Sequence, residues 1–437
     1  MKRSKTLVVV IMLSLFLVAS IATGSGTVEE KPQQVELLFW NFGMYGISYL
    51  EQGKEKSEWY ISKAIERFER DNPGITIKMD YQDGTKTVEM LTSAAMAKSG
   101  PDVVAMWGGV YVTNLKDSLI PLNEYFSPAE IKSIHGWENH AVGNKYYGAP
   151  VMKMVACIFY NKSLFKAAGV NPSTDYDGTY EKFLGICKKL KNAGITPMIN
   201  GVGDGWGLSF WEGSLYASQV MDPEGLIKDI VAGKKDFSTT PELISAFQTC
   251  QDMFKMGYFN DDVNTITRDE AITLFVNSQG AMFSGLSFDL FGMRENMRDD
   301  LGVLQMPSMK ANSPNFGACS GGIGPNALVA TNYGEHPDEA IKFIKFLRTY
   351  EEEREYVKAT GELPCIDGAY NDVLVDPLQA EFLKYTNIAM MLDNLMPGNV
   401  AGTWFSFEPM VVSNQMSVKD FMNEMDSARD EALAAVE

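Results

Sequence analysis

Histidine and cysteine are scarce in this chain, with 3 histidines and 5 cysteines among 437 residues. They are dispersed along the sequence as His135, His140 and His336, and as Cys157, Cys187, Cys250, Cys319 and Cys365. A metal site needs several such side chains at short spacing, so we expect neither a metal ion nor another cofactor. The cysteines are also too few for a disulfide framework, and their odd number leaves at least one free thiol.

Basic residues are in deficit, because 38 Lys and Arg face 56 Asp and Glu for a formal net charge of −18. Nucleic acid and anionic membranes are bound by basic faces that neutralise phosphate, so we expect neither as a partner. The composition, 45% hydrophobic and 22% charged, is that of a globular protein. A chain of this length exceeds the ~100–200 residues of one domain, so we expect two.

Long apolar runs are absent apart from residues 7–18, which follow a short basic segment. This run is shorter than the ~20 residues of a membrane-spanning helix, which favours a signal peptide over 1–22 rather than an anchor. No cysteine precedes Cys157, so a lipid anchor after the signal is not expected. We therefore expect export, to a periplasm or to the extracellular face of the cytoplasmic membrane.

The first part of the chain alternates apolar strand patterns with helix patterns. We expect strands over 35–40, 75–81 and 103–106, and a helix that Ser57 caps and that ends before Pro73. Successive strand-helix-strand units form a mainly parallel sheet flanked by helices, which places this chain in the α/β class. Ligands of such sheets bind beyond the carboxyl ends of the strands.

Residues 147–172 combine a Tyr-Gly-x-Pro turn, an apolar strand and the sequence Tyr160-Asn161-Lys162. This segment resembles the crossover between the two lobes of the extracellular solute-binding proteins, which deliver sugars and other solutes to ABC importers. Further motifs of that family follow in its order at 68–77, 99–104, 119–125, 280–285 and 301–307. The resemblance implies the two-lobed, type II fold of periplasmic binding proteins, with a mainly parallel sheet in each lobe and hinge segments between them.

The same resemblance implies where each lobe begins and ends. The first lobe is expected to comprise 35–152 and 308–358, and the second 157–303 and 364–437. The hinge segments between them are expected at 153–156, 304–307 and 359–363.

Aromatic rings beside planar polar groups suit a carbohydrate, since sugars offer flat C–H faces and many hydroxyls. From the strand ends, from the glycine-rich segment 201–207 and from the resemblance we predict a set of ligand-binding residues. The set is Trp40, Asn41, Asp83, Trp107, Trp206, Trp211, Phe288, Asp289, Gly321, Gly322, Trp404 and Glu408. The alternative for each tryptophan is a place in the core, and for the glycine pair an ordinary turn.

The resemblance therefore implies a monomeric binding protein rather than an enzyme, with a carbohydrate, expected to be an oligosaccharide, as ligand and permease subunits of an ABC importer as partners. Met154 stands where maltose binders carry an acid, which argues against maltose. Two alternatives remain open. A secreted glycoside-active enzyme would need two carboxyl groups across the bond it cleaves, and the same fold could bind a polyamine through carboxylates and rings.

Overall fold

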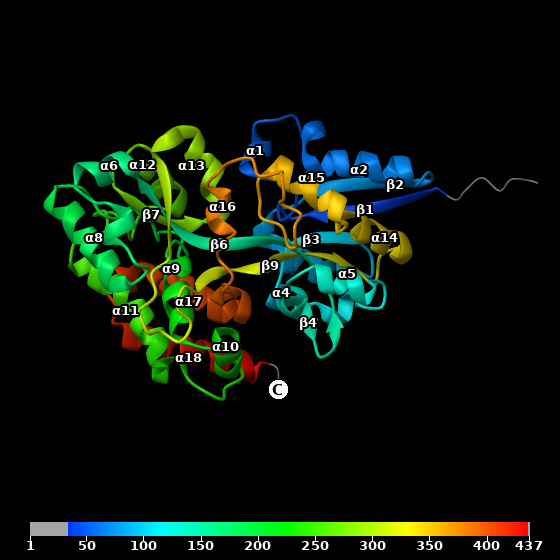
Figure 1. Cartoon of the computed structure of the whole chain (residues 1–437). Helices are drawn as coiled ribbons and strands as arrows, with labels where there is room; N and C mark the ends of the chain where they lie inside the picture. The colour runs from blue at the N-terminus through cyan, green and yellow to red at the C-terminus, as the bar shows by residue number, and fades with distance from the viewer. Residues whose placement is uncertain (1–33, 436–437) are drawn as a thin grey trace, which may run out of the picture.

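The computed structural model describes residues 34–435, so the predicted signal peptide lies outside the described part of the chain. The two predicted lobes are present, and two long strands, β6 (Ala149–Asn161) and β9 (Cys319–Ala330), run through both of them (Figure 1). The fold class is confirmed as α/β with two lobes. Within the described residues, no helix has the length and apolar character to cross a bilayer.

The sheet of the first lobe has the order β2-β1-β3-β9-β6. Strands β1 (Val35–Asn41), β2 (Ile75–Tyr81) and β3 (Val103–Trp107) are parallel, whereas β9 is antiparallel to β3 and to β6. The helices of this lobe are α1 (Tyr49–Gln52), α2 (Tyr60–Asp71), α3 (Thr87–Ala97), α4 (Val110–Asn114), α5 (Pro128–Ser133), α14 (Pro337–Leu347) and α15 (Tyr350–Thr360), with a hairpin of β4 (Ala141–Val142) and β5 (Lys145–Tyr146).

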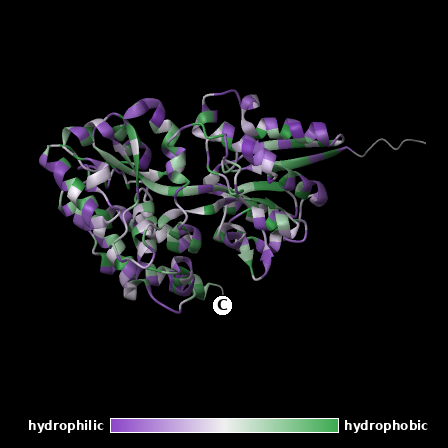
Figure 2. Ribbon diagram, in the orientation of Figure 1, coloured by the Kyte–Doolittle hydropathy of each residue, from purple (hydrophilic) through white to green (hydrophobic). Residues whose placement is uncertain are grey.

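Successive residues of these strands face opposite sides of the sheet and bury both faces. Phe39 packs edge-to-face on Phe343 of α14, and Phe343 also contacts Phe68 of α2. The opposite face forms a separate cluster in which Val104 and Met106 of β3 are buried. Both faces are therefore covered, as parallel strands require, and Figure 2 shows the strands as hydrophobic between largely hydrophilic outer helix faces.

In the second lobe, the far half of β6 is antiparallel to β7 (Met282–Leu286) and β8 (Leu301–Gln305). Parallel bridges at Met198 continue this sheet, and the short strand β10 (Ile388–Met390) pairs with the start of β9. The helices are α6 (Lys162–Ala167), α7 (Pro172–Asp175), α8 (Tyr180–Asn192), α9 (Ser209–Gln219), α10 (Pro223–Val231), α11 (Pro241–Lys255), α12 (Arg268–Val276), α13 (Leu290–Met297), α16 (Gln379–Phe382), α17 (Gly398–Val412) and α18 (Val418–Ala434).

Capping residues set several helix boundaries. Thr179 accepts a hydrogen bond from the backbone N–H of Lys182 and begins α8, and Ser417 does the same for α18 through Asp420. The predicted cap at Ser57 is wrong, since residues 56–58 form a 3₁₀ turn and α2 begins after Trp59. The Glu51 side chain caps α2 instead, because it accepts a hydrogen bond from the backbone N–H of Tyr60, the first residue of the helix.

The connection after β8 can be followed from the contacts of residues 308–318. Ser308 bridges Thr179, and Asn315 donates to the carbonyl oxygen of Ala217, so residues 308–318 stay with second-lobe helices. The loop before β9 remains packed on α9 of the second lobe. The chain returns to the first lobe within β9, which is hydrogen-bonded to β6 along its path between the lobes. Residues 304–307 therefore lie in the second lobe.

The first connection contains an irregularity of β6. The register of β6 against β9 shifts between Val151 and Lys153, and Met152 between them has φ of +50°. A side chain at positive φ is sterically disfavoured, and this one is held by the antiparallel ladder on either side. The Sγ of Cys365 donates to the Met152 carbonyl oxygen at 2.8 Å, which ties the irregularity to the segment after α15.

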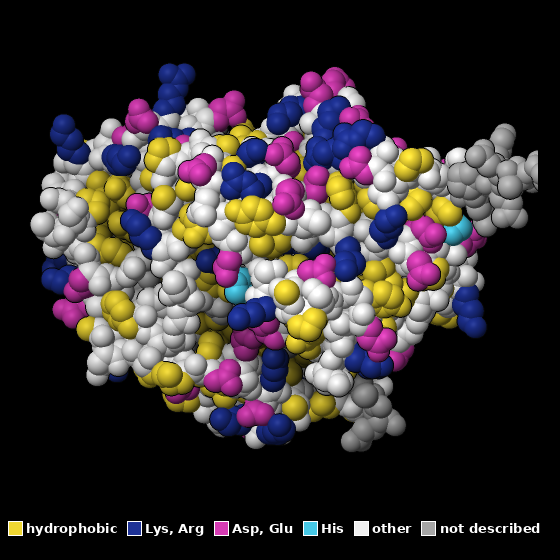
Figure 3. Space-filling view, turned by 45° about the vertical axis from the view of Figure 1, so that its right-hand side comes forward, with side chains coloured by type: hydrophobic (Ala, Val, Ile, Leu, Met, Phe, Trp, Pro, Cys, Tyr) yellow, Lys and Arg dark blue, Asp and Glu magenta, His cyan; other side chains and the backbone are white. Residues whose placement is uncertain are grey.

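Charged residues of both signs are interspersed on the surface. Figure 3 shows acidic and basic side chains mixed over one face. Several of the surface pairs are local, such as Arg70 with Asp71 and Lys63 with Glu66. Exposed pairs of this kind contribute little stability, roughly 0–1 kcal/mol each.

Candidate functional site

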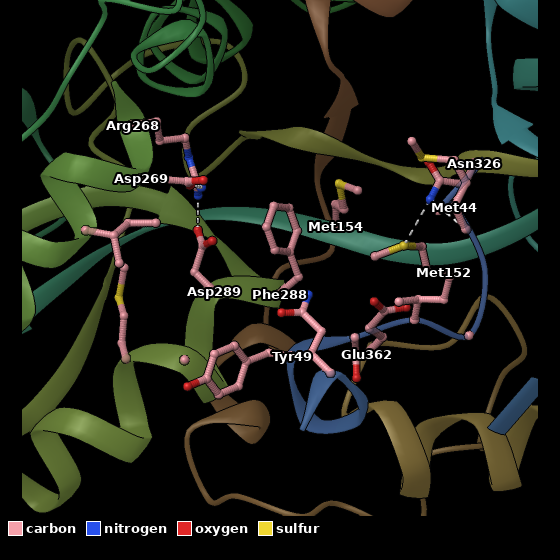
Figure 4. Close-up of a pocket in the computed structure, with 18 of the residues that line it drawn as sticks. Met44, Tyr49, Met152, Met154, Arg268, Asp269, Phe288, Asp289, Asn326 and Glu362 are labelled. Atoms are coloured by element: carbon pink, nitrogen blue, oxygen red, sulfur yellow. Dashed lines mark hydrogen bonds and ion pairs between the residues drawn. The ribbon is translucent and has the colours of Figure 1, made fainter. Parts of the chain in front are cut away.

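A cavity of about 690 Å³ lies between the two lobes. Figure 4 shows side chains of both lobes and of the connecting strand β6 turned towards it. Its walls are formed by residues 43–49, Gln52, Trp107, Met152, Met154, Arg268, Asp269, Ile272, Thr273, Val276, Asn277, Phe288, Asp289, Gly292, Met293, Asn296, Asn326 and Glu362. A concave site shared by two lobes, mainly apolar with a few polar groups, has the properties of a small-molecule site.

The loop after β1 forms one wall and is shaped by Asn41. The carboxamide oxygen of Asn41 accepts the backbone N–H groups of Gly43 and Met44, and its nitrogen donates to the Tyr45 carbonyl oxygen at 2.8 Å. Asn41 is fully buried and is absent from the cavity wall. It therefore acts through the loop 43–46, whose residues do line the cavity.

Trp107 and Tyr49 bring aromatic rings of the first lobe to the cavity wall, and the ring of Tyr45 lies behind the wall in the core. Tyr45 is stacked on Tyr356, with ring centroids 5.1 Å apart, and Trp107 at the end of β3 pairs in register with Asn326 of β9. Tyr49 reaches the second lobe, where its hydroxyl donates to the Glu295 carboxylate of α13. The cavity thus offers rings beside a carboxamide, which is the combination that carbohydrate ligands use.

The second-lobe wall is built around a buried ion pair between Arg268, the first residue of α12, and Asp289. The guanidinium is only 3% exposed and lies 5.1–5.6 Å from the ring centroids of Trp206, Phe283 and Phe288. Asp289 also accepts the backbone N–H of Leu286 at 2.8 Å. Charge pairing and ring contacts together hold Phe288 and Asp289 at the cavity.

Glu362 forms part of the wall where the chain leaves α15. Its carboxylate accepts the Tyr356 hydroxyl, and it follows Gly361, whose φ of +71° ends the helix in the left-handed conformation. Burial, and next the negative charges of Glu51 and Glu353, raise the pKa of Glu362 to about 8. This carboxyl group is therefore largely protonated at neutral pH.

Replacing Glu362 by Gln is expected to flatten the dependence of stability on pH. The folded-state pKa of about 8 lies above the ordinary value of 4.5, so the folded protein holds this proton to higher pH than the unfolded chain. The stability that the proton contributes is complete below pH 4.5 and is lost as pH rises through 8. Glu362→Gln should therefore raise the melting temperature at pH 8.5 by about 2–4 °C, and less at pH 5.

Differential scanning calorimetry across pH 5–9 measures this difference, with Glu66→Gln on the exposed face of α2 as the control. An equal shift at all pH values would show that Glu362 is not held protonated by its surroundings.

Three of the predicted ligand-binding residues are brought together at the cavity, namely Trp107, Phe288 and Asp289. Five others lie outside its wall. Trp40 packs edge-to-face on Phe42 beside the small core cluster, Asp83 is exposed in the turn after β2, Asn41 supports the loop, and Trp206 faces Arg268. Gly322 is buried on β9 behind the cavity, next to Met390.

Gly321 is required by strand packing. It has φ of +145°, and a Cβ there would lie 2.3 Å from the Met154 carbonyl oxygen of β6. Glycine at this position therefore permits the close approach of β9 to β6 where the lobes are joined. Its predicted role in presenting backbone to a ligand stays a prediction.

The predicted contacts at Trp211, Trp404 and Glu408 require correction, because all three are fully buried within the second lobe. Trp211 donates through Nε1 to the Thr249 hydroxyl at 3.0 Å. Every residue from 209 to 218 of α9 is buried, so this helix runs through the core and directs Trp211 into it. Glu408 accepts the backbone N–H of Leu208 at 3.1 Å.

Sequence reasoning missed Tyr49, Arg268, Asn326 and Glu362. A partial signal existed for Arg268, because Thr267 and Glu270 form a capping box that predicts a helix beginning between them. No sequence signal places Tyr49 or Glu362 at the cavity, since both reach it only through the juxtaposition of the lobes.

Two α/β lobes, joined by continuous strands and enclosing a cavity between them, define a two-lobed solute-binding protein. The chain belongs to the bacterial extracellular solute-binding protein family, whose model matches residues 53–353.

Curated relatives span most of the chain. The multiple sugar-binding protein of Streptococcus mutans is 24% identical over 339 residues, which cover 75% of this chain and 76% of the relative. The sn-glycerol-3-phosphate-binding periplasmic protein of Shigella flexneri is 24% identical over 369 residues, with 81% and 79% covered.

Solved structures share the fold at low identity. A chitin oligosaccharide binding protein superimposes with a TM-score of 0.77 at 21% identity, covering 92% of this chain and 99% of the other. The apo-form of RafE from Streptococcus pneumoniae gives 0.71 at 16% identity, with 92% and 99% covered. At these identities the likeness shows the two-lobed fold.

Proposed function

We propose that this protein is the solute-receiving component of an ABC importer and that it binds a carbohydrate in the cavity between the lobes. The observation that carries the proposal is the placement of Trp107 on one lobe opposite Phe288 on the other. Rings on both sides can pack on the two faces of a sugar, while Asn326 and Asn277 offer hydrogen bonds to its hydroxyls. The family and the relative named for binding sugars support this assignment.

A ligand that contacts both lobes favours the arrangement in which they are closed, in proportion to its additional contacts there. We propose that β6 near Met152 and β9 absorb the bending, with the segment after α15 as a third connection. Closure would present the two lobe surfaces together to the permease subunits, and the protein would act as a monomer. Membership of the extracellular solute-binding protein family supports permease subunits as the partners.

The cavity offers a poor acid–base pair for hydrolysis. Asp289 is committed to Arg268, and burial holds Glu362 protonated beside Tyr356. The third wall acid, Asp269, is 91% exposed and lies 3.8 Å from Arg268. A glycosidase places two carboxyl groups on either side of the scissile bond, with one of them ionised as base or nucleophile. We therefore favour binding, and recovery of the sugar intact after incubation with the protein tests this against catalysis.

Trp107→Ala and Phe288→Ala are each expected to weaken carbohydrate binding by about 10–100-fold. This loss of affinity corresponds to about 1.4–2.8 kcal/mol, the contribution expected of a ring stacked on a buried ligand. Isothermal titration calorimetry with neutral oligosaccharides, including fragments of chitin and of xylan, measures the effect. Trp40→Ala is the matched control, because Trp40 lies on the neighbouring strand β1, packs on Phe42 and is absent from the cavity wall. Unchanged affinity in both cavity variants would contradict the proposed site.

A further inference from the structure

The charged residues of the cavity are unequally available to a ligand. Among the described residues that form its wall, Arg268 is the one basic side chain, whereas Asp269, Asp289 and Glu362 are acidic. Arg268 is 3% exposed, bonded to Asp289 and covered by aromatic rings. A phosphate or carboxylate could bind this guanidinium only by breaking a buried ion pair, which would leave Asp289 without its partner.

Glu362, in contrast, makes no ion pair with another described residue. Its carboxylate accepts the Tyr356 hydroxyl, and the nearest charged neighbours are the acids Glu51 and Glu353. These two are already paired, Glu353 with Arg348 at 2.6 Å and Glu51 with Lys54 at 3.6 Å. Asp269, the third acid of the wall, is 91% exposed and lies 3.8 Å from Arg268. Glu362 is therefore the wall acid without a basic partner among the described residues, and a cationic group of a ligand could approach it.

We propose that the cavity selects its carbohydrate by charge: it binds a sugar that carries a free amino group, placed against Glu362, and it rejects phosphorylated and acidic sugars. This inference rests on the proposed function and specifies the class of sugar. An ammonium group can donate up to three hydrogen bonds, and a carboxylate has acceptor sites for them.

The protonation of Glu362 supplies a signature that packing alone would not produce. Burial, with the charges of Glu51 and Glu353, raises its pKa to about 8 in the empty cavity, so an ammonium ligand must displace a proton at pH 7. Binding of an amino sugar in its ammonium form should therefore release the Glu362 proton, and the fraction of ligand that arrives as free amine takes up a proton and reduces the net release accordingly. A neutral sugar at the same site should release none.

Three disaccharides of similar size test the proposal by calorimetry at pH 7, in two buffers of different ionisation enthalpy. They are the β-1,4 disaccharide of glucosamine, its N-acetylated form, and cellobiose 6-phosphate. We expect the free amine to bind at least about tenfold more tightly than the acetylated form, with proton release, and the phosphate to show no binding.

Glu362→Gln should abolish the tenfold advantage and the proton release, so that the free amine and the acetylated disaccharide bind with similar affinity. Asp117→Asn is the control, because it removes the same charge from an exposed residue paired with Lys116 at the surface. Equal or tighter binding of the acetylated or phosphorylated sugar overturns the charge selection and leaves the proposed function standing. Absence of binding by all three, and by the neutral oligosaccharides above, overturns both.

Discussion

Trp404→Ala is expected to lower the free energy of unfolding by about 3–5 kcal/mol, the range for removing a large buried ring. Trp404 is fully buried and lies 5.3 Å from Phe247 between ring centroids, where α17 packs on α11. Truncation leaves a cavity in the core of the second lobe, and the surrounding helices can close it only in part. Urea denaturation followed by circular dichroism measures the loss.

Phe405→Ala is the matched control, since Phe405 neighbours Trp404 on the same helix but is only partly buried. Its expected cost is about 1–2 kcal/mol. Sugar affinity of the folded Trp404→Ala protein should stay within about twofold of the parent. Near-parental stability together with lost sugar binding would return Trp404 to the role that the family resemblance implied.

Arg268→Ala is expected to cost about 3–5 kcal/mol of stability, because it leaves the buried carboxylate of Asp289 unpaired. The same change removes the guanidinium group that contacts the rings of Trp206 and Phe288. We therefore expect weaker sugar binding as well, through loss of the second-lobe wall. Chemical denaturation gives the first effect and calorimetry the second.

The double variant Arg268→Met/Asp289→Asn should recover most of the lost stability, since neither buried charge remains. Arg70→Ala, which breaks an exposed pair with Asp71, should cost less than about 1 kcal/mol. If Arg268→Ala were no more costly than Arg70→Ala, the buried ion pair would not be holding the cavity wall.

The fold followed from patterns that depend on short stretches of sequence. Strands 35–41 and 75–81 were predicted to within a residue, because short apolar runs bounded by turn residues are typical of buried strands. The ordered family motifs added the two lobes. The return to the first lobe was misplaced, since Met306-Pro307 indicates a break in the chain but does not show which lobe the following loop packs against.

The site could be predicted only where it lies at a strand end. Trp107 ends a buried strand, and the structure places it in the wall of the candidate cavity. Trp211 and Trp404 were misassigned, because a tryptophan in a core helix and one at a ligand have the same local sequence. Arg268 escaped notice because its partner Asp289 is brought to it by tertiary packing.

The position of β9 has a consequence for the order in which the chain can fold. In the sheet β9 lies between β3 and β6, yet it is synthesised long after both of them. In a growing chain that ends before residue 319, β3 and β6 therefore lack the strand that pairs with both of them. Helix α14, which packs on β9, is also still missing. Pairings between such distant segments form slowly. The first lobe, although translated first, is completed only after most of the second has been made.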